Sequence, residues 1–170
     1  HLLAKELVPS ALRDVGITPQ IGETIALDAR FVTSAGAPTR FGDFISDDRV
    51  TILNFVYFNC PMLCGLLLNG LHDALIGLDS KYDGKFRIVS VSMDSRDTVE
   101  SAKAYQDKYL NSFSDRQFEW DFLVGDAENI QALADSVGFQ FRFIEDTGEF
   151  AHGASLIFVN SKGAVSQYLY

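Results

Sequence analysis

The sequence predicts an α/β fold in which helices flank a central mixed β-sheet, and three observations lead to this prediction. Strand-like runs alternate with amphipathic helical segments between residues 49 and 138, which is typical of parallel strands joined by helical crossovers. Residues 24–45 alternate in polarity around an Ala-Gly-Ala-Pro turn at 35–38, as in a β-hairpin. Two further strand-like runs flank the turn Ser-Lys-Gly at 161–163, and they predict a closing hairpin.

The first crossover unit carries the strongest signals. Residues 49–58 (RVTILNFVYF) form a continuous apolar and β-branched run, as expected of a central strand that is buried on both faces. Leucines then recur at helical spacing from Leu67 to Leu78, and the polar segment 80–85 follows them. We therefore expect a helix that begins just after Cys60-Pro61 and ends before residue 80.

The alternation continues along the rest of the chain. Strands are predicted at 86–93 and 118–125, helices at 97–110 and 126–138, and an edge-like strand at 139–144. Asp97 or Thr98 is the expected N-cap of the first of these helices, and Asp126 that of the second. This order of elements is thioredoxin-like, with an N-terminal hairpin added and an extra strand near 139–144.

Length and charge limit the domain organisation and the partners. A chain of 170 residues suits one domain, and we expect residues 1–22 to form an extension that packs on it. The net charge of −9 disfavours nucleic acid and anionic membrane surfaces, because both attract clustered Lys and Arg. Residues 50–71 lack charged side chains, but polar residues interrupt their centre, so a strand followed by a helix is favoured over a membrane span. The start at His1, without a leader segment, suggests a mature or trimmed soluble portion.

The two cysteines of the chain, Cys60 and Cys64, lie between the first central strand and the helix that follows it. Ligands gather at this edge of a parallel sheet. A structural disulfide is disfavoured, because a domain of this size forms a core without one and the closed loop would be short. A redox dithiol and a pair of metal ligands both remain open. The N-terminus of the helix lowers the pKa of a nearby thiol, which favours a reactive thiolate at Cys60, and the three-residue spacer lets two thiolates meet on one ion.

A metal site needs a third donor, and the chain has three histidines. His1 is terminal, and His72 is expected on the solvent side of its helix. His152 directly precedes the strong strand-like run LIFV at 156–159, a segment that lies beside the cysteine loop in thioredoxin-like folds. Thioredoxins place a cis-proline there, and this chain has none at that position. The position therefore favours His152 as a ligand over a structural histidine.

Two thiolates and one imidazole form a soft, three-donor site. Such donors select Cu(I), and they also hold Cu(II) with one further weak ligand. Zinc is the rival metal, but structural zinc prefers four protein ligands. Asp94 follows the strand at 86–93 and is a candidate for orienting a ligand, with a turn or cap role as the alternative. Met62 and Met93 are expected to fill the core.

These residues resemble the Sco/SenC family of copper-binding, thioredoxin-like factors for cytochrome oxidase assembly. The segments NFVYFNCPMLC, VSVSMDSRDT and FAHGASLIFVNSKGAVSQYLY carry the resemblance, which covers most of residues 20–170. It implies that Cys60, Cys64 and His152 hold copper, which is delivered to the dinuclear copper centre of the oxidase's copper-bearing subunit. It also implies an extracytoplasmic location, in the periplasm or the mitochondrial intermembrane space, with any membrane anchor outside this chain. Other copper chaperones and thioredoxin-like reductants are further expected partners.

Two departures from the family leave a second function open. Many relatives have Pro after the second cysteine, where Gly65 stands here, and an acidic residue before the histidine, where Ala151 stands here. Neither change removes a ligand. The alternative is a thiol–disulfide oxidoreductase in which Cys60 and Cys64 are catalytic and reduce the cysteines of the oxidase subunit. A thiol-based redox sensor is the third class.

Overall fold

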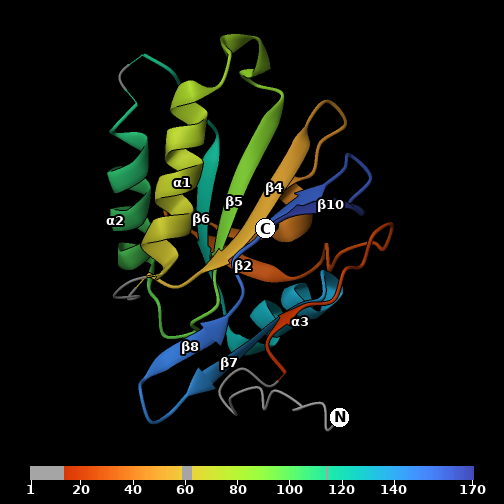
Figure 1. Ribbon diagram of the computed structural model, residues 1–170, viewed down its shortest axis with the longest axis vertical. Coiled ribbons are helices and arrows are strands. Elements are labelled where there is room, and N and C mark those ends of the chain that lie inside the picture. The colour runs from red at the N-terminus through yellow and green to blue at the C-terminus, as the bar shows by residue number, and fades with distance from the viewer. Residues whose placement is uncertain (1–13, 59–62, 114) are drawn as a thin grey trace, which may run out of the picture.

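The computed structural model describes residues 14–58, 63–113 and 115–170, and its main feature is a seven-stranded mixed sheet (Figure 1). The strand order is β10-β9-β4-β5-β6-β2-β3. The three central strands are parallel, and the pairs β4–β9, β9–β10, β2–β6 and β2–β3 are antiparallel. The strand bounds are β2 Arg30–Thr33, β3 Pro38–Arg40, β4 Val50–Val56, β5 Phe86–Ser92, β6 Trp120–Val124, β9 Leu156–Val159 and β10 Val165–Leu169.

Helices cover both faces of this sheet. α1 (Leu63–Gly77) and α2 (Val99–Leu110) lie side by side on one face, whereas α3 (Ala127–Ser136) lies on the other (Figure 1). Short 3₁₀ helices span Phe41–Phe44 and Ser80–Tyr82. The thioredoxin-like prediction, with its N-terminal hairpin formed by β2 and β3 and its closing hairpin formed by β9 and β10, is confirmed.

The helix termini show why these segments are helical. Thr98 caps α2 by accepting a hydrogen bond from the backbone N–H of Ser101, at 3.2 Å, and Asp126 caps α3 through the N–H of Asn129, at 2.8 Å. Gly138 follows α3 with φ of +64°, and a Cβ there would lie 1.8 Å from the carbonyl oxygen of Thr18. Only glycine therefore fits where the chain leaves α3.

A second sheet of three strands was not expected. β1 (Gly16–Ile17), β7 (Phe139–Ile144) and β8 (Glu149–His152) pair in the order β1-β7-β8. The strand predicted at 139–144 is confirmed as β7, but its expected place at an edge is wrong, since β7 is the central strand of this sheet. His152 is the last residue of β8. This strand was not predicted, because four residues are too few to show a clear period in the sequence.

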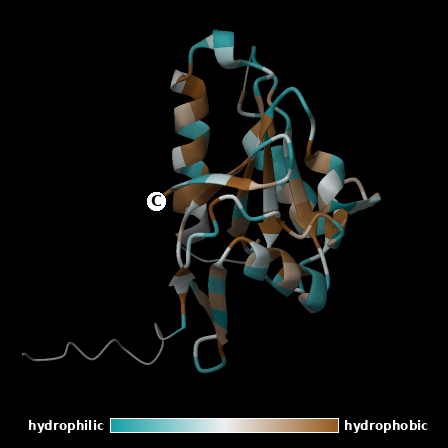
Figure 2. Cartoon of the chain, turned by 90° about the vertical axis from the view of Figure 1, so that its right-hand side faces the viewer, coloured by the Kyte–Doolittle hydropathy of each residue, from teal (hydrophilic) through white to brown (hydrophobic). Residues whose placement is uncertain are grey.

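Aromatic side chains join the two sheets through one core. Phe55 of β4 and Phe139 of β7 are each 1% exposed, and their rings stack with centroids 4.6 Å apart. On the opposite face Trp120 and Phe122 of β6 stack at 5.4 Å and pack against Tyr109 of α2. Figure 2 shows hydrophobic residues concentrated in the central strands and hydrophilic residues in the outer turns. The small sheet is therefore held to the main sheet by buried aromatic contacts.

The N-terminal segment contacts the domain wherever it is described. The backbone N–H groups of Thr18 and Gly22 donate to the carbonyl groups of Gly138 and Val165, each at 2.8 Å. The N–H of Gln20 donates to the hydroxyl of Tyr168 at 2.9 Å. Residues 1–13 lie outside the described residues. Within the described part of the chain, no helix is long and apolar enough to cross a membrane.

Candidate metal site

The connection between β4 and α1 starts at two buried aromatic residues. Tyr57 and Phe58, which follow β4, are 5% and 4% exposed. Cys60 and Met62 lie outside the described residues, and Cys64 is the second residue of α1, with its side chain also outside them. The first turn of α1 contains no acidic residue. No carboxylate on that turn therefore opposes the positive end of the helix dipole.

His152 lies against the same end of β4. Its ring is edge-on to the Tyr57 ring, with centroids 6.1 Å apart, and it is 6.4 Å from the ring of Phe139. Pairing of β8 with β7 places His152 opposite Phe141. Residues far apart in the sequence are thus brought together by the small sheet and by β4.

The protonation state of His152 suits a metal ligand. Its Nδ1 atom lies 2.8 Å from the carbonyl oxygen of Gly153, and because a carbonyl can only accept, Nδ1 carries the proton. Burial lowers the pKa of His152 below its ordinary value of 6.5, although the hydrogen bond to Gly153 raises it in part. The imidazole is therefore neutral at pH 7, and its lone pair is on Nε2, the arrangement that metal-binding histidines use.

Chain length limits how far Cys60 lies from His152. Cys60 is three residues beyond Tyr57, and three residues span at most about 11 Å even when fully extended. Tyr57 itself touches His152. The predicted ligand set of Cys60, Cys64 and His152 is compatible with this geometry and stays a prediction, because both thiols lie outside the described part of the structure.

Asp94 lies at the same edge of the sheet and forms an ion pair with Arg96. It is 4% exposed, and its two carboxylate oxygens accept hydrogen bonds from Nε and Nη2 of Arg96, both at 2.8 Å. Burial raises the pKa of Asp94, but the hydrogen bonds and charge of Arg96 outweigh it and leave the pKa below its ordinary value. Thr98, not Asp94, caps α2. The role of Asp94 in orienting a ligand stays a prediction.

Asp97 also belongs to this site, although its sequence position predicted only a candidate N-cap. It is 7% exposed, and its Oδ2 atom accepts hydrogen bonds from the backbone N–H of Phe58 at 2.7 Å and from the hydroxyl of Ser92 at 2.6 Å. Phe58 is two residues before Cys60. The signal for this role was weak, since an acidic residue just before a helix is ordinarily a cap.

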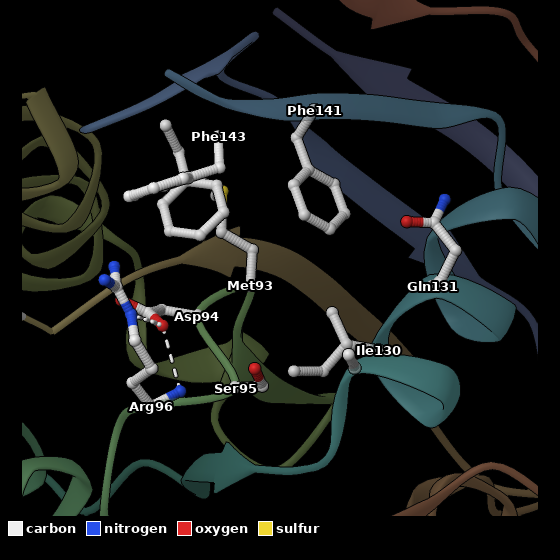
Figure 3. A pocket seen from close by; sticks show the side chains of 10 residues that line it. Met93, Asp94, Ser95, Arg96, Ile130, Gln131, Phe141 and Phe143 are labelled. Carbon is white, nitrogen blue, oxygen red and sulfur yellow. Dashed lines mark hydrogen bonds and ion pairs between the residues drawn. The ribbon is translucent and has the colours of Figure 1, made fainter. Parts of the chain in front are cut away.

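A pocket of about 320 Å³ adjoins the site (Figure 3). The β5–α2 loop, the first half of α3 and the β7–β8 hairpin surround it, and its walls include Phe141, Phe143 and Phe150. The guanidinium carbon of Arg96 lies 4.7 Å from the centre of the Phe143 ring. Because Phe150 also contacts Tyr57, at 5.3 Å between ring centroids, the pocket begins beside the His152 contact.

The family model described as SCO1/SenC matches residues 21–170. This chain belongs to the SCO1/SenC family. No curated protein matches the sequence in a search of such proteins. The family assignment therefore rests on the family model, which spans the main sheet, its three helices and the small sheet except β1.

Solved structures show the same fold at low sequence identity. A candidate electron transfer protein from Aquifex aeolicus VF5 is 20% identical, with a TM-score of 0.75 over 89% of this chain and 85% of that one. ScoI from Arabidopsis thaliana, solved with copper bound, is 21% identical with a TM-score of 0.67 over 88% and 87%. BsSco, solved in work on a disulfide switch and described as a member of the Sco family of cytochrome c oxidase assembly proteins, is 20% identical with a TM-score of 0.65 over 89% and 85%.

The remaining soft or basic candidates have structural roles. Met93 is 3% exposed, which confirms its place in the core. The prediction that His72 faces solvent is wrong, because its side chain is 16% exposed, its Nε2 atom lies 2.6 Å from the hydroxyl of Ser112, and its ring packs on Phe113 at 4.7 Å. Among the described residues, no group of three or more His, Cys, Asp or Glu side chains could hold a metal, and Cys60 is not among those residues.

Proposed function

We propose that this SCO1/SenC protein binds copper through Cys60, Cys64 and His152 and supplies it to the dinuclear copper centre of cytochrome c oxidase. The observation that supports this most is the place and state of His152. A half-buried, neutral imidazole, whose Nδ1 proton is held by a carbonyl, lies against Tyr57, three residues before the first cysteine.

The donor set fits copper better than the other metals considered. Two thiolates and one imidazole nitrogen are soft donors, which select Cu(I) and also hold Cu(II) when a further weak ligand is added. Structural zinc prefers four protein ligands, and the predicted set has three. Burial of His152 helps, because the imidazole does not need to lose a proton at pH 7 before it binds.

The residues around the donors prepare the site. The carbonyl of Gly153 fixes the orientation of the His152 ring, and the edge-on contact with Tyr57 restricts it from the other side. The N-terminus of the helix is expected to favour a thiolate at Cys60, the cysteine that precedes α1 in the sequence. Copper supplied to such a site would meet donors that are already deprotonated and, for the imidazole, already oriented.

Family membership supports the destination of the copper. The expected partner is the copper-bearing subunit of cytochrome c oxidase, and other copper chaperones or thioredoxin-like reductants are expected to load copper or to keep the cysteines reduced. This exchange takes place outside the cytoplasm, on the periplasmic side of the inner membrane or in the mitochondrial intermembrane space. The net charge of −9 favours a partner surface with basic residues.

A thiol–disulfide oxidoreductase is the second candidate, and the closely spaced pair Cys60 and Cys64 favours it. Such an enzyme would reduce the cysteines of the oxidase subunit before copper is inserted, or would act as a redox sensor. Thioredoxin-like reductants use a cis-proline beside the dithiol. The described residues contain no cis peptide bond, and Ser155 directly precedes β9. This difference is the reason for placing the copper role first.

An anaerobic titration of reduced protein with Cu(I) against a competing chelator tests the proposal. One copper ion per chain, bound tightly by the wild type and weakly by Cys60→Ser, is the expected result. A wild-type protein that loses the competition to the chelator at every ratio, while it reduces a protein disulfide efficiently, would replace the copper role with the oxidoreductase.

A further inference from the structure

The β5–α2 loop, residues 93–98, is fixed by a set of hydrogen bonds among its own side chains. Arg96 holds both carboxylate oxygens of Asp94, and its backbone N–H donates to Asp94 as well, at 2.9 Å. The hydroxyl of Ser92 accepts from the N–H of Asp94 at 3.0 Å and donates to Asp97 at 2.6 Å. Figure 3 shows Asp94 and Arg96 facing one another across this loop. The loop is therefore rigid enough to hold a neighbouring segment in place.

That neighbouring segment directly follows β4. Oδ2 of Asp97 accepts the backbone N–H of Phe58 at 2.7 Å, across 39 residues of sequence. The Phe58 ring is fixed separately, because it packs on Tyr105 at 5.0 Å and on Phe122 at 6.1 Å. With its N–H and its ring both held, Phe58 sets the direction in which the chain continues toward Cys60, two residues later.

The local roles that an aspartate ordinarily has at this position are filled by other residues. Thr98 caps α2, and Arg96 pairs with Asp94. Burial raises the pKa of Asp97, and the hydrogen bonds from Ser92 and Phe58 only partly offset it. A carboxylate in such surroundings is costly for stability unless its hydrogen bonds compensate. The stability of the fold alone does not explain why a carboxylate stands at position 97. Its hydrogen bond to Phe58, in the segment before Cys60, offers another explanation.

We propose that Asp97 is a positioning residue of the thiol site: its buried carboxylate fixes the chain that leads from β4 into the cysteine loop, and so sets where Cys60 meets its partners. The inference rests on the proposed function in that it takes Cys60 as a reactive thiol, and it holds for copper binding and for thiol chemistry alike. Asp97 acts through Phe58 and not by contact with the metal.

Two substitutions separate positioning from general stability. Asp97→Asn keeps the shape of the side chain and one oxygen that Phe58 and Ser92 can still share, as they share Oδ2 in the wild type, but both bonds lose the negative charge that strengthens them. Asp97→Ala removes both bonds. Asp121→Asn is the matched control, because Asp121 is a carboxylate of β6 whose pKa is also raised by burial and whose ionic partner is Arg87, at 3.2 Å.

Each protein is compared in three measurements: the midpoint of thermal unfolding without metal, the Cu(I) affinity of the reduced protein, and the equilibrium of the Cys60–Cys64 dithiol with a glutathione buffer. We expect Asp97→Ala to weaken Cu(I) binding by about 10–100-fold, as is typical when a residue that orients a ligand is lost. Asp97→Asn should have a smaller effect in the same direction. Both should change the dithiol equilibrium, whereas Asp121→Asn should leave affinity and equilibrium at wild-type values, whichever way its unfolding midpoint moves.

The outcomes distinguish this inference from the proposed function. Wild-type Cu(I) affinity and dithiol equilibrium in a folded Asp97→Asn protein would show that Asp97 is only structural, whatever its unfolding midpoint. If the wild type itself fails to bind copper, the proposed function is wrong, and the dithiol equilibrium, which needs no metal, still tests Asp97. If Asp97→Ala does not fold, Asp97→Asn alone decides.

Discussion

Tyr57 and His152 lie edge to face, with their ring centroids 6.1 Å apart and their planes at 83°. This contact joins the residue that follows β4 to the last residue of β8, although 95 residues separate the two positions (152 − 57). It requires both sheets to form and to pack on each other. The predicted donors therefore come from two parts of the fold: the cysteines from one local segment, and the imidazole from the small sheet.

We predict that copper binding depends on the redox state of the cysteines. Reduced protein should bind one Cu(I) per chain, and the disulfide form should bind essentially none, because a disulfide has no thiolate to donate. Copper is measured after desalting of samples prepared with and without reductant. Equal copper contents in the two samples would contradict a site made from both thiols.

We also predict that the protein is a poor general reductant. Substrate disulfides dock on the backbone beside the cis-proline in thioredoxins, and this chain has His152 and then Gly153 in the corresponding segment. Turnover of a model protein disulfide should fall well below that of a thioredoxin assayed in parallel. A comparable rate would make the oxidoreductase the better account of this chain.

The sequence predicted the fold well because its signals are local. The buried run at 49–58, the leucine spacing after it and the caps at Thr98 and Asp126 each depend on neighbouring residues. The same signals placed Cys60 and Cys64 at the junction of β4 and α1. His152 was identified by its position before β9, although β8, the strand that carries it, was missed.

The long-range contacts could not be predicted in the same way. Asp97 looks like an ordinary cap in the sequence, and only the folded chain shows its carboxylate bound to the N–H of Phe58. His72 looks like a solvent-facing residue of an amphipathic helix, yet its ring packs beneath the segment after α2, on Phe113. Both depend on which elements become neighbours, and that information is not contained in the period of any one segment.

The depressed pKa of His152 predicts an acid-sensitive stability of the metal-free protein. Because burial lowers the pKa in the folded state, the unfolded chain binds a proton at this residue more tightly, and protonation favours unfolding. Protonation of His152 therefore has no effect on the free energy of unfolding above the ordinary pKa of 6.5, where His152 is neutral in both states. The free energy of unfolding should fall as the pH drops from about 6.5 toward the lower folded-state pKa.

Urea unfolding of the wild type and of His152→Gln between pH 7.5 and 5 measures this effect. The difference between the two proteins isolates His152, because all other titrating groups are common to both. The wild type should lose more stability than the variant as the pH falls through this window. Parallel curves would mean that His152 has the same pKa in the folded and unfolded states.

The stacked pair Phe55 and Phe139 predicts a large loss of stability on truncation. Both rings are fully buried at 1% exposure, and they join β4 to β7 at a centroid distance of 4.6 Å. Phe55→Ala should lower the free energy of unfolding by about 3–5 kcal/mol. Phe143→Ala is the control, since that ring is 37% exposed and should cost much less. Similar losses for both variants in denaturant titrations would contradict the packing described here.

The last prediction separates a ligand from a neighbour at His152. His152→Ala should leave a folded protein that still binds copper through two thiolates, but at least about 10–100-fold more weakly, because a lost ligand costs no less than a lost orienting residue. The Cu(II) absorption spectrum should change as well, since an imidazole nitrogen leaves the coordination sphere. Cys60→Ser or Cys64→Ser should weaken Cu(I) binding further, because a soft thiolate is replaced by a hard hydroxyl.

His72→Ala is the control. It removes the same kind of side chain from a place where its partners include Ser112 and Phe113, and the variant should bind copper as the wild type does. If His152→Ala matched His72→Ala in both affinity and spectrum, His152 would be a structural residue. The dithiol alone would then define the site, and the oxidoreductase would become the better account of its chemistry.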